Sequence, residues 1–208
     1  MEWCDVDLHR LISRGGAVEE GKMTRYVKHI AMALAHCHER GIAHNDVKPE
    51  NVLIRHDIDT AKLCDFGSST IEVGTSSGST LRDHNDALEW DTSPFSTSSC
   101  YMAPEARETL ARVTGGRGLD RLKTDMWSLG VLIYLCVCGC APWRLASEQD
   151  PDFRRFIAEG LDFYPSHLSM ELKTLLSRLL STDVGIRPSA SEVCNSSWVT
   201  MGSDSTVS

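Results

Sequence analysis

Four polar residues in one stretch of the chain have the types and the spacing that phosphoryl transfer needs. Asp46, Lys48 and Asn51 fall within a single polar loop, and Asp65 follows shortly after it. Phosphoryl transfer depends mainly on positioning and charge neutralisation. It needs a base near the acceptor hydroxyl, a cation on the moving phosphate and oxygen ligands for magnesium. The side chains of these four residues supply all three parts, so the sequence predicts a magnesium-dependent phosphoryl-transfer site.

Five sequence motifs occur in the order that protein kinases use. The stretch HNDVKPEN at 44–51 resembles the H-R-D-x-K-P-x-N catalytic loop of that family, and DFG at 65–67 resembles its magnesium-binding motif. The three later motifs are APE at 103–105, DMWSLG at 125–130 and RP at 187–188. The resemblance covers roughly residues 1–199. Because five motifs keep one order, it is a specific resemblance to the eukaryotic-type serine/threonine protein kinase family.

The resemblance implies a role for each residue of the predicted site. Asp46 would accept the proton of the substrate hydroxyl, and Lys48 would contact the γ-phosphate of ATP. Asn51 and Asp65 would hold Mg²⁺, and Leu53 is similar to the residue that packs beneath the adenine. A Lys two positions after the Asp is typical of serine/threonine kinases. The implied cofactors are therefore ATP and Mg²⁺, and the implied partner is a protein with a Ser or Thr acceptor.

The resemblance also implies residues that hold the site in place. Asp125 would brace the backbone of the catalytic loop, and His44 would stack on Phe66. Glu105 and Arg187 are expected to pair with each other. We interpret this pair as structural rather than catalytic, because a buried ion pair mainly penalises the loss of either partner.

One residue of the catalytic loop departs from the family pattern. Asn45 stands where kinases usually have an Arg that pairs with a phosphorylated residue of the activation segment. An Asn cannot form that charge-assisted fork. The base, the Lys and the metal ligands are unchanged. We therefore expect Asn45 to alter regulation and to leave the chemistry intact.

Hydrophobic spacing indicates the elements that must position these residues. Apolar side chains on one face of 24–40 predict a helix before the polar loop, and the short apolar runs 52–54 and 61–64 predict strands after it. Further helices are predicted at 7–13, 123–138, 152–159, 169–180 and from 190 onward. The Ser- and Thr-rich stretch 68–99 has almost no periodicity and is predicted to be a long loop. The predicted fold class is mainly α with a small β element.

One segment is apolar enough to raise the question of a membrane span. Residues 126–143 are nearly all apolar, but Gly139 and Pro142 interrupt the last third. The remaining run of about 13 residues is too short for a bilayer and suits a buried helix. We therefore predict a buried central helix.

Composition limits the classes of partner. The net charge of −8 argues against nucleic acid or an anionic membrane surface as the main partner. The eight cysteines include no C-x-x-C pair, so we expect reduced, mostly buried thiols. The charged beginning MEWCDVDLHR does not resemble a signal peptide. We expect an intracellular protein, cytoplasmic or nuclear, with no nucleic-acid or membrane partner.

The sequence contains no motif of a kinase small lobe. It has no G-x-G-x-x-G, and no lysine can be assigned to V-A-I-K. The resemblance therefore implies a protein-kinase-like fold with the hinge and the large C-terminal lobe at 1–199 and a missing small lobe. The polar end of the chain, 200–208, is predicted to be a disordered tail. We expect a truncated sequence rather than a natural half-kinase. The surface that faces the small lobe in kinases would then be exposed and favour association.

Three hypotheses for function remain open. The first is a serine/threonine protein kinase, and a weak resemblance of Pro142-Trp143 and Trp198 to the calmodulin-dependent branch accompanies it. The second is a pseudokinase or kinase-like interaction module without catalysis, which the missing motifs favour. The third is a small-molecule kinase such as an antibiotic phosphotransferase. The APE and DMWSLG motifs argue against it, because in the family they build a platform for protein substrates.

Overall fold

The computed structural model describes residues 4–55, 57–72, 99–111 and 118–203. The helices in this part are α1 (Leu8–Gly15), α2 (Glu20–His38), α3 (Pro104–Ala111), α4 (Arg121–Cys138), α5 (Pro151–Glu159), α6 (Met170–Leu179), α7 (Ala190–Cys194) and α8 (Ser197–Ser203). The strands are β1 (Val6–Asp7), β2 (Ile42–Ala43), β3 (Val52–Arg55), β4 (Thr60–Leu63) and β5 (Thr70–Ile71). Single 3₁₀ turns are η1 (Pro49–Asn51), η2 (Ser99–Tyr101) and η3 (Gly160–Phe163). The prediction of a mainly helical chain with a small β element is confirmed.

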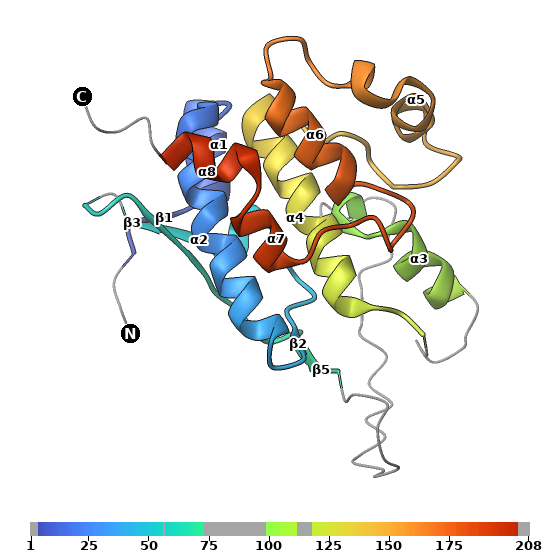
Figure 1. Cartoon of the computed structure of the whole chain (residues 1–208), viewed down its shortest axis with the longest axis horizontal. Coiled ribbons are helices and arrows are strands. Elements are labelled where there is room, and N and C mark those ends of the chain that lie inside the picture. The colour runs from blue at the N-terminus through green and yellow to red at the C-terminus, as the bar shows by residue number, and fades with distance from the viewer. Residues whose placement is uncertain (1–3, 56, 73–98, 112–117, 204–208) are drawn as a thin grey trace.

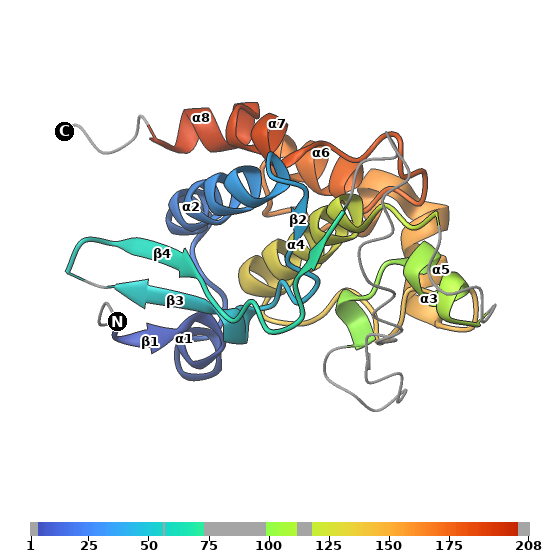
Figure 2. The same ribbon diagram turned by 90° about the horizontal axis from the view of Figure 1, so that it is seen from below.

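The elements are arranged in layers around two long helices (Figures 1 and 2). Helices α6, α7 and α8 lie on one side of α2 and α4, and the sheet of β1, β3 and β4 lies with α1 on the other side. Helices α3 and α5 lie at the end of the molecule away from the sheet of β1, β3 and β4. The polar loop, residues 44–51, runs between β2 and β3 and therefore lies where the helical layers meet the sheet.

Helix α4 is the central buried helix that the sequence predicts. All of its residues from Thr124 to Tyr134 are buried, so its apolar sequence faces protein on every side. Asp120 caps its N-terminus, and Gly139 ends it in a left-handed conformation with φ 74°. Gly130 permits close packing against α6, because a Cβ there would lie 2.9 Å from the Leu179 side chain. No helix in the described part of the chain is long and apolar enough to cross a membrane.

Helix α2 begins earlier than its apolar pattern predicts. The Glu19 side chain accepts a hydrogen bond from Gly21 N, so the helix starts at Glu20 instead of Thr24. Glu20 is anchored from two other elements: its carboxylate accepts hydrogen bonds from Trp198 Nε1 (2.8 Å) and Ser169 N (3.2 Å). These partners come from α8 and the cap of α6, and periodicity along α2 carries no information about them.

Two small antiparallel sheets flank the polar loop. The order in the larger one is β1-β3-β4, and its register pairs Val52 with Leu63 and Leu53 with Lys62. The smaller one pairs β2 with β5. The sequence predicts β3 and β4 correctly. It does not predict β1, β2 and β5, because a strand of two residues is too short to show alternation.

Further sequence predictions need correction. Helix α3 begins at Pro104, within the APE motif, where no helix was predicted. The last predicted helix is two helices, because the chain turns at Asn195 between α7 and α8. Helix α8 continues to Ser203, so the prediction of disorder is wrong for 200–203, while 204–208 lie outside the described residues. Within the predicted loop 68–99, β5 is ordered and residues 73–98 also lie outside the description.

Candidate active site

Two side chains of the polar loop converge on the carboxylate of Asp46. Lys48 Nζ lies 2.8 Å from Asp46 Oδ2. Asn51 Nδ2 donates to the same oxygen at 2.7 Å and to the main-chain oxygen of Asp46 at 2.8 Å. Asp46 and Lys48 are each about one quarter exposed, so solvent reaches the group. The structure thus brings together a candidate base, a cation and an amide that the sequence placed in one loop.

The turn that carries Asn51 is connected directly to the segment before Asp65. Pro49 occupies the first turn of η1, where its missing N–H costs nothing. Cys64 N then donates to Asn51 O at 2.9 Å. Burial raises the pKa of the Cys64 thiol, and the neighbouring Asp65 carboxylate raises it further, so this thiol stays neutral beside the site.

Asp65 leaves β4 in an unusual backbone conformation. Its φ is 62°, in the left-handed region that residues other than Gly rarely adopt. Its Oδ1 accepts a hydrogen bond from Gly67 N at 3.2 Å, and the residue is exposed. Such backbone outliers cluster at functional sites, where the surrounding structure holds them.

The donor set around the loop fits magnesium. Asn51 uses its Nδ2 toward Asp46, which leaves its Oδ1 as an oxygen ligand, and the exposed Asp65 offers a carboxylate. Magnesium prefers oxygen ligands, and it usually takes one or two from the protein and the rest from water and phosphate. No cluster of three or more His, Cys, Asp or Glu residues suited to a metal ion occurs in the described part of the chain. Asn51 and Asp65 are therefore the candidate ligands for Mg²⁺ held together with a nucleotide.

The predicted ring contact beside the site is present. The rings of His44 and Phe66 are in edge contact, with centroids 4.8 Å apart, as the sequence predicts. His44 Nε2 lies 3.0 Å from Cys64 O, which fixes the imidazole against the segment before Asp65. Leu53 alternates with the buried Val52 and Ile54, so it faces the other side of the sheet and is partly exposed. Its predicted contact with adenine stays a prediction.

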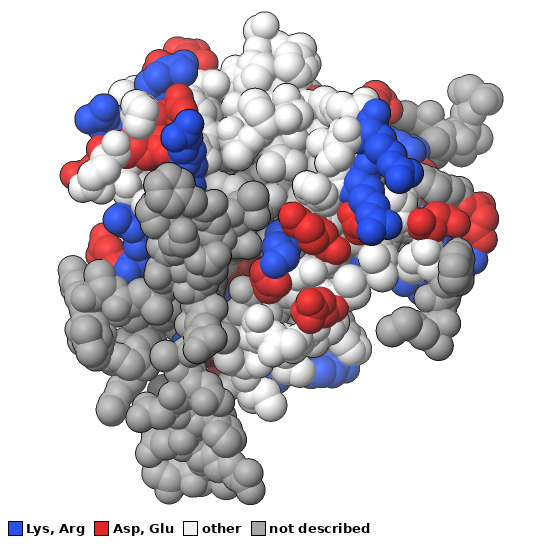
Figure 3. Space-filling model, turned by 180° about the vertical axis from the view of Figure 1, so that it is seen from behind, with Lys and Arg blue, Asp and Glu red and all other residues white. Residues whose placement is uncertain are grey.

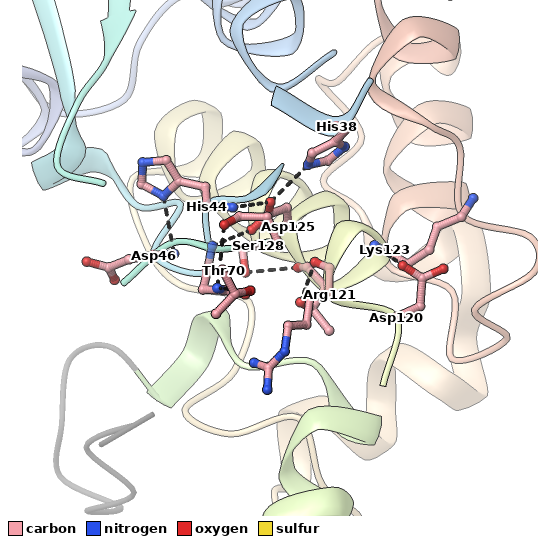
Figure 4. Close-up of polar contacts among 12 residues, drawn as sticks. His38, His44, Asp46, Thr70, Asp120, Arg121, Lys123, Asp125 and Ser128 are labelled. Carbon is pink, nitrogen blue, oxygen red and sulfur yellow. Dashed lines mark hydrogen bonds and ion pairs between the residues drawn. The ribbon is translucent and has the colours of Figure 1, made fainter. Parts of the chain in front are cut away.

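Asp125, in α4, holds the backbone of the polar loop through hydrogen bonds (Figure 4). Its carboxylate is only 1% exposed and lies in the second turn of α4. Oδ2 accepts a hydrogen bond from His44 N at 2.8 Å, and Oδ1 accepts one from Asn45 N at 2.8 Å. The predicted bracing role is therefore confirmed. His38 Nε2, from the last turn of α2, lies 2.9 Å from Oδ2. Sequence reasoning missed His38, although a His in the last turn before the loop was visible.

The predicted pair of Glu105 and Arg187 is confirmed. The two side chains form a bidentate ion pair with distances of 2.5 and 2.8 Å. Arg187 is completely buried, donates to Ser181 O, and lies over the Trp127 ring at 4.8 Å. The pair ties the start of α3 to the segment before α7 and to the central helix.

Sequence reasoning also missed where the Asn45 side chain points. Its Nδ2 donates to Ser68 O at 2.8 Å and to Thr70 Oγ1 at 3.0 Å, so it joins the polar loop to β5. Its φ is 63°, in the left-handed region. Asn is one of the few residues that tolerate this region, and that preference was a usable indication.

The site is identified by its polar contacts and not by a cavity. A hollow of about 1080 Å³ lies between α3 and α5, and one of about 290 Å³ lies among α2, α4 and the start of α7. Neither is lined by Asp46, Lys48, Asn51 or Asp65. The space-filling view shows small groups of acidic and basic side chains separated by uncharged atoms (Figure 3).

Comparison with known proteins identifies the family. The family described as "Protein kinase domain" matches residues 1–199. Sperm motility kinase 2B of Mus musculus is 35% identical over 204 residues, which are 98% of this chain and 37% of that protein. CBL-interacting protein kinase 19 of Oryza sativa subsp. japonica is 32% identical over 187 residues, which are 90% of this chain and 33% of that protein.

A third relative carries the substrate class in its name. CBL-interacting serine/threonine-protein kinase 16 of Arabidopsis thaliana is 31% identical over 192 residues, which are 92% of this chain and 38% of that protein. The chain thus spans between 33% and 38% of the length of these curated relatives. The ordered motifs, the contacts around Asp46 and the match over 1–199 lead to one conclusion: this chain belongs to the protein kinase family.

Proposed function

We propose that this chain is the C-terminal catalytic lobe of a serine/threonine protein kinase, which transfers the γ-phosphate of ATP to Ser or Thr hydroxyls of a protein. The convergence of Lys48 and Asn51 on the Asp46 carboxylate carries the proposal. A Lys at this place beside the base is typical of serine/threonine kinases. The serine/threonine specificity printed in the name of one relative supports the same substrate class.

The contacts suggest how each side chain contributes. Lys48 and Asn51 both bind Asp46 Oδ2, so they hold the carboxylate in one orientation and leave its other oxygen available to accept the proton of a hydroxyl. Lys48 is exposed enough to turn toward a phosphate and neutralise its charge. Asn51 and Asp65 would hold Mg²⁺, which supplies positive charge to the bound nucleotide.

The proposal includes a partner that would cover the exposed side chains of Phe66 and Leu53. Phe66 is 47% exposed although its ring packs on His44, and Leu53 is partly exposed. Adenine would rest on Leu53, and a small lobe would cover both side chains. An uncovered chain is then expected to associate through this surface.

We also propose an intracellular location, since no disulfide joins the eight cysteines, all of which lie in the described residues.

A pseudokinase or kinase-like interaction module is the second candidate. The observation in its favour is that the 208 residues contain no G-x-G-x-x-G and no assignable V-A-I-K lysine. The intact contacts of Asp46, Lys48 and Asn51 argue for catalysis, because an interaction module does not need them.

The deciding experiment uses a fusion in which a protein-kinase small lobe, with its glycine-rich loop and lysine, precedes Met1. We expect this fusion to phosphorylate Ser/Thr peptides, and Asp46→Asn to lower kcat by at least ~10²-fold, the lower range for a positioned base. The matched control is Asp57→Asn, an exposed carboxylate in the β3–β4 turn that forms an ion pair with Arg55. Equal rates for Asp46→Asn and the parent would reject the base. A fusion that folds and is inactive would favour the interaction module.

A further inference from the structure

The residue that departs from the family pattern is built into the loop in two ways. Asn45 has a left-handed backbone, with φ 63°, and its N–H donates to the buried Asp125 carboxylate at 2.8 Å. Asn adopts this conformation several times more readily than most residues. The choice of Asn therefore lowers the conformational cost of presenting the N–H to Asp125.

The side chain of Asn45 then reaches the segment that follows Asp65. Its Nδ2 donates to Ser68 O at 2.8 Å and to the hydroxyl of Thr70 at 3.0 Å. The orientation of the amide follows from its partners, since Ser68 O can only accept and must face the NH₂ group. The Oδ1 atom is buried and receives no hydrogen bond from the described residues. The contact with Ser68 and Thr70 thus fixes which way the amide points.

These hydrogen bonds reinforce a short pair of strands. Thr70 begins β5, which pairs with β2 in the register Ala43 to Thr70, and Glu72 N donates to Gly41 O at 2.6 Å. Two residues on each strand are marginal by themselves. The amide adds two cross-links beside this pairing, and all of its partners are uncharged or main-chain groups.

We propose that Asn45 is a positioning residue: its amide ties Ser68–Thr70 to the polar loop and so holds Asp65, three residues before Ser68, in its left-handed conformation. The tie uses no anion and no titrating group. An Arg at this position would leave a cation that needs a phosphate or carboxylate partner, whereas the amide is satisfied by groups already in the fold. The hydrogen bonds from Asn45 to Ser68 and Thr70 therefore need no charged partner. The consequence for Asp65 rests on the proposed function.

Hydrogen exchange on the 208-residue chain tests the tie without any assay of catalysis. The amide of Glu72 reports β2–β5 pairing, because its acceptor is Gly41 O. Asn45→Gly keeps the left-handed backbone unstrained and removes only the side chain. We expect Glu72 exchange to become about tenfold faster, which corresponds to about 1.4 kcal/mol, while amides within α4 keep their rates.

A matched pair at Thr70 isolates the hydroxyl. Thr70→Val removes the acceptor with little change in shape and is expected to speed Glu72 exchange by about threefold, the effect of one neutral hydrogen bond. Thr70→Ser keeps the hydroxyl and should retain most of the protection. Unchanged exchange in Asn45→Gly, or equal effects of the Val and Ser variants, would overturn the proposal.

Binding of Mn²⁺, used alone as a paramagnetic probe for the magnesium ligands, separates positioning from plain stabilisation. We expect Asn45→Gly to weaken Mn²⁺ binding by about three- to tenfold, which corresponds to about 0.6–1.4 kcal/mol lost from ordering Asp65. Asp120→Ala, which removes a helix cap elsewhere, should leave Mn²⁺ binding unchanged. Faster exchange with unchanged Mn²⁺ affinity would refute the positioning of Asp65. If Asp65→Ala does not change Mn²⁺ binding, the proposed metal site is rejected. Hydrogen exchange at Glu72 would still show whether Asn45 ties Ser68–Thr70 to the polar loop.

Discussion

Replacing Asp125 by Ala is expected to destabilise the chain by about 4 kcal/mol. The carboxylate is 1% exposed and accepts the main-chain N–H groups of His44 and Asn45, and His38 Nε2 is its third partner. Ala removes the acceptor and leaves both main-chain donors without a partner in the protein. A buried donor left unsatisfied costs about 1–3 kcal/mol. The two donors together give about 2–6 kcal/mol, a large part of the ~5–15 kcal/mol that stabilises a typical domain.

Urea denaturation of the 208-residue chain measures this loss. Trp127 and Trp143 are buried in the core and report unfolding by fluorescence. With a slope of about 2 kcal/mol/M, a loss of 4 kcal/mol lowers the midpoint by about 2 M. Asp125→Asn keeps the volume and one acceptor oxygen and should recover about half of the loss.

The control for a general effect of removing a carboxylate lies on the same helix. Asp120→Ala removes the exposed cap whose Oδ1 accepts from Lys123 N at 3.1 Å, and it should cost only ~1 kcal/mol. If Asp125→Ala unfolds at the same urea concentration as Asp120→Ala, the bracing of the loop by Asp125 contributes little. The reasoning from buried donors would then be refuted.

Three further predictions follow from the site and the core. The 208-residue chain should bind Mg-ATP no better than millimolar and transfer no phosphate. It contains no glycine-rich loop or V-A-I-K lysine, and each missing charge-assisted contact is worth ~1.5–3 kcal/mol. A micromolar affinity in calorimetry, or phosphate transfer that Asp65→Ala abolishes, would contradict this prediction. Glu105→Ala should lower the urea midpoint more than Arg187→Met does. Glu105→Ala leaves the fully buried Arg187 cation without its partner, whereas Arg187→Met leaves a Glu105 side chain that is 24% exposed to water. The reverse order would show that water reaches Arg187. Burial raises the pKa of the Cys100 thiol to about 12, so this thiol stays protonated at pH 8 and should resist iodoacetamide. The exposed Cys140 should be alkylated first. Equal labelling of the two cysteines in mass spectrometry would disprove the burial of Cys100.

The sequence by itself determined the chemistry-bearing residues and most of the helices. Asp46, Lys48 and Asn51 lie within one turn-rich loop, so their neighbourhood follows from the chain's short reach. Helix α4 was predictable as buried because it is apolar on every face, and β3 and β4 because their apolar runs border the loop. Local spacing was sufficient for these features, since each depends on residues that are close in the chain.

Only the tertiary structure decided the partners that hold the loop and the order of the segment after it. Asp125 meets Asn45 across 80 positions of sequence, and Arg187 meets Glu105 across 82. The resemblance implied these two pairings, but their burial and hydrogen bonds depend on how α4 packs beneath the loop. The ties from Asn45 to Ser68 and Thr70 had no counterpart in any motif. A hydrogen bond between distant segments exists only after packing has brought its donor and acceptor together, so no local pattern records it.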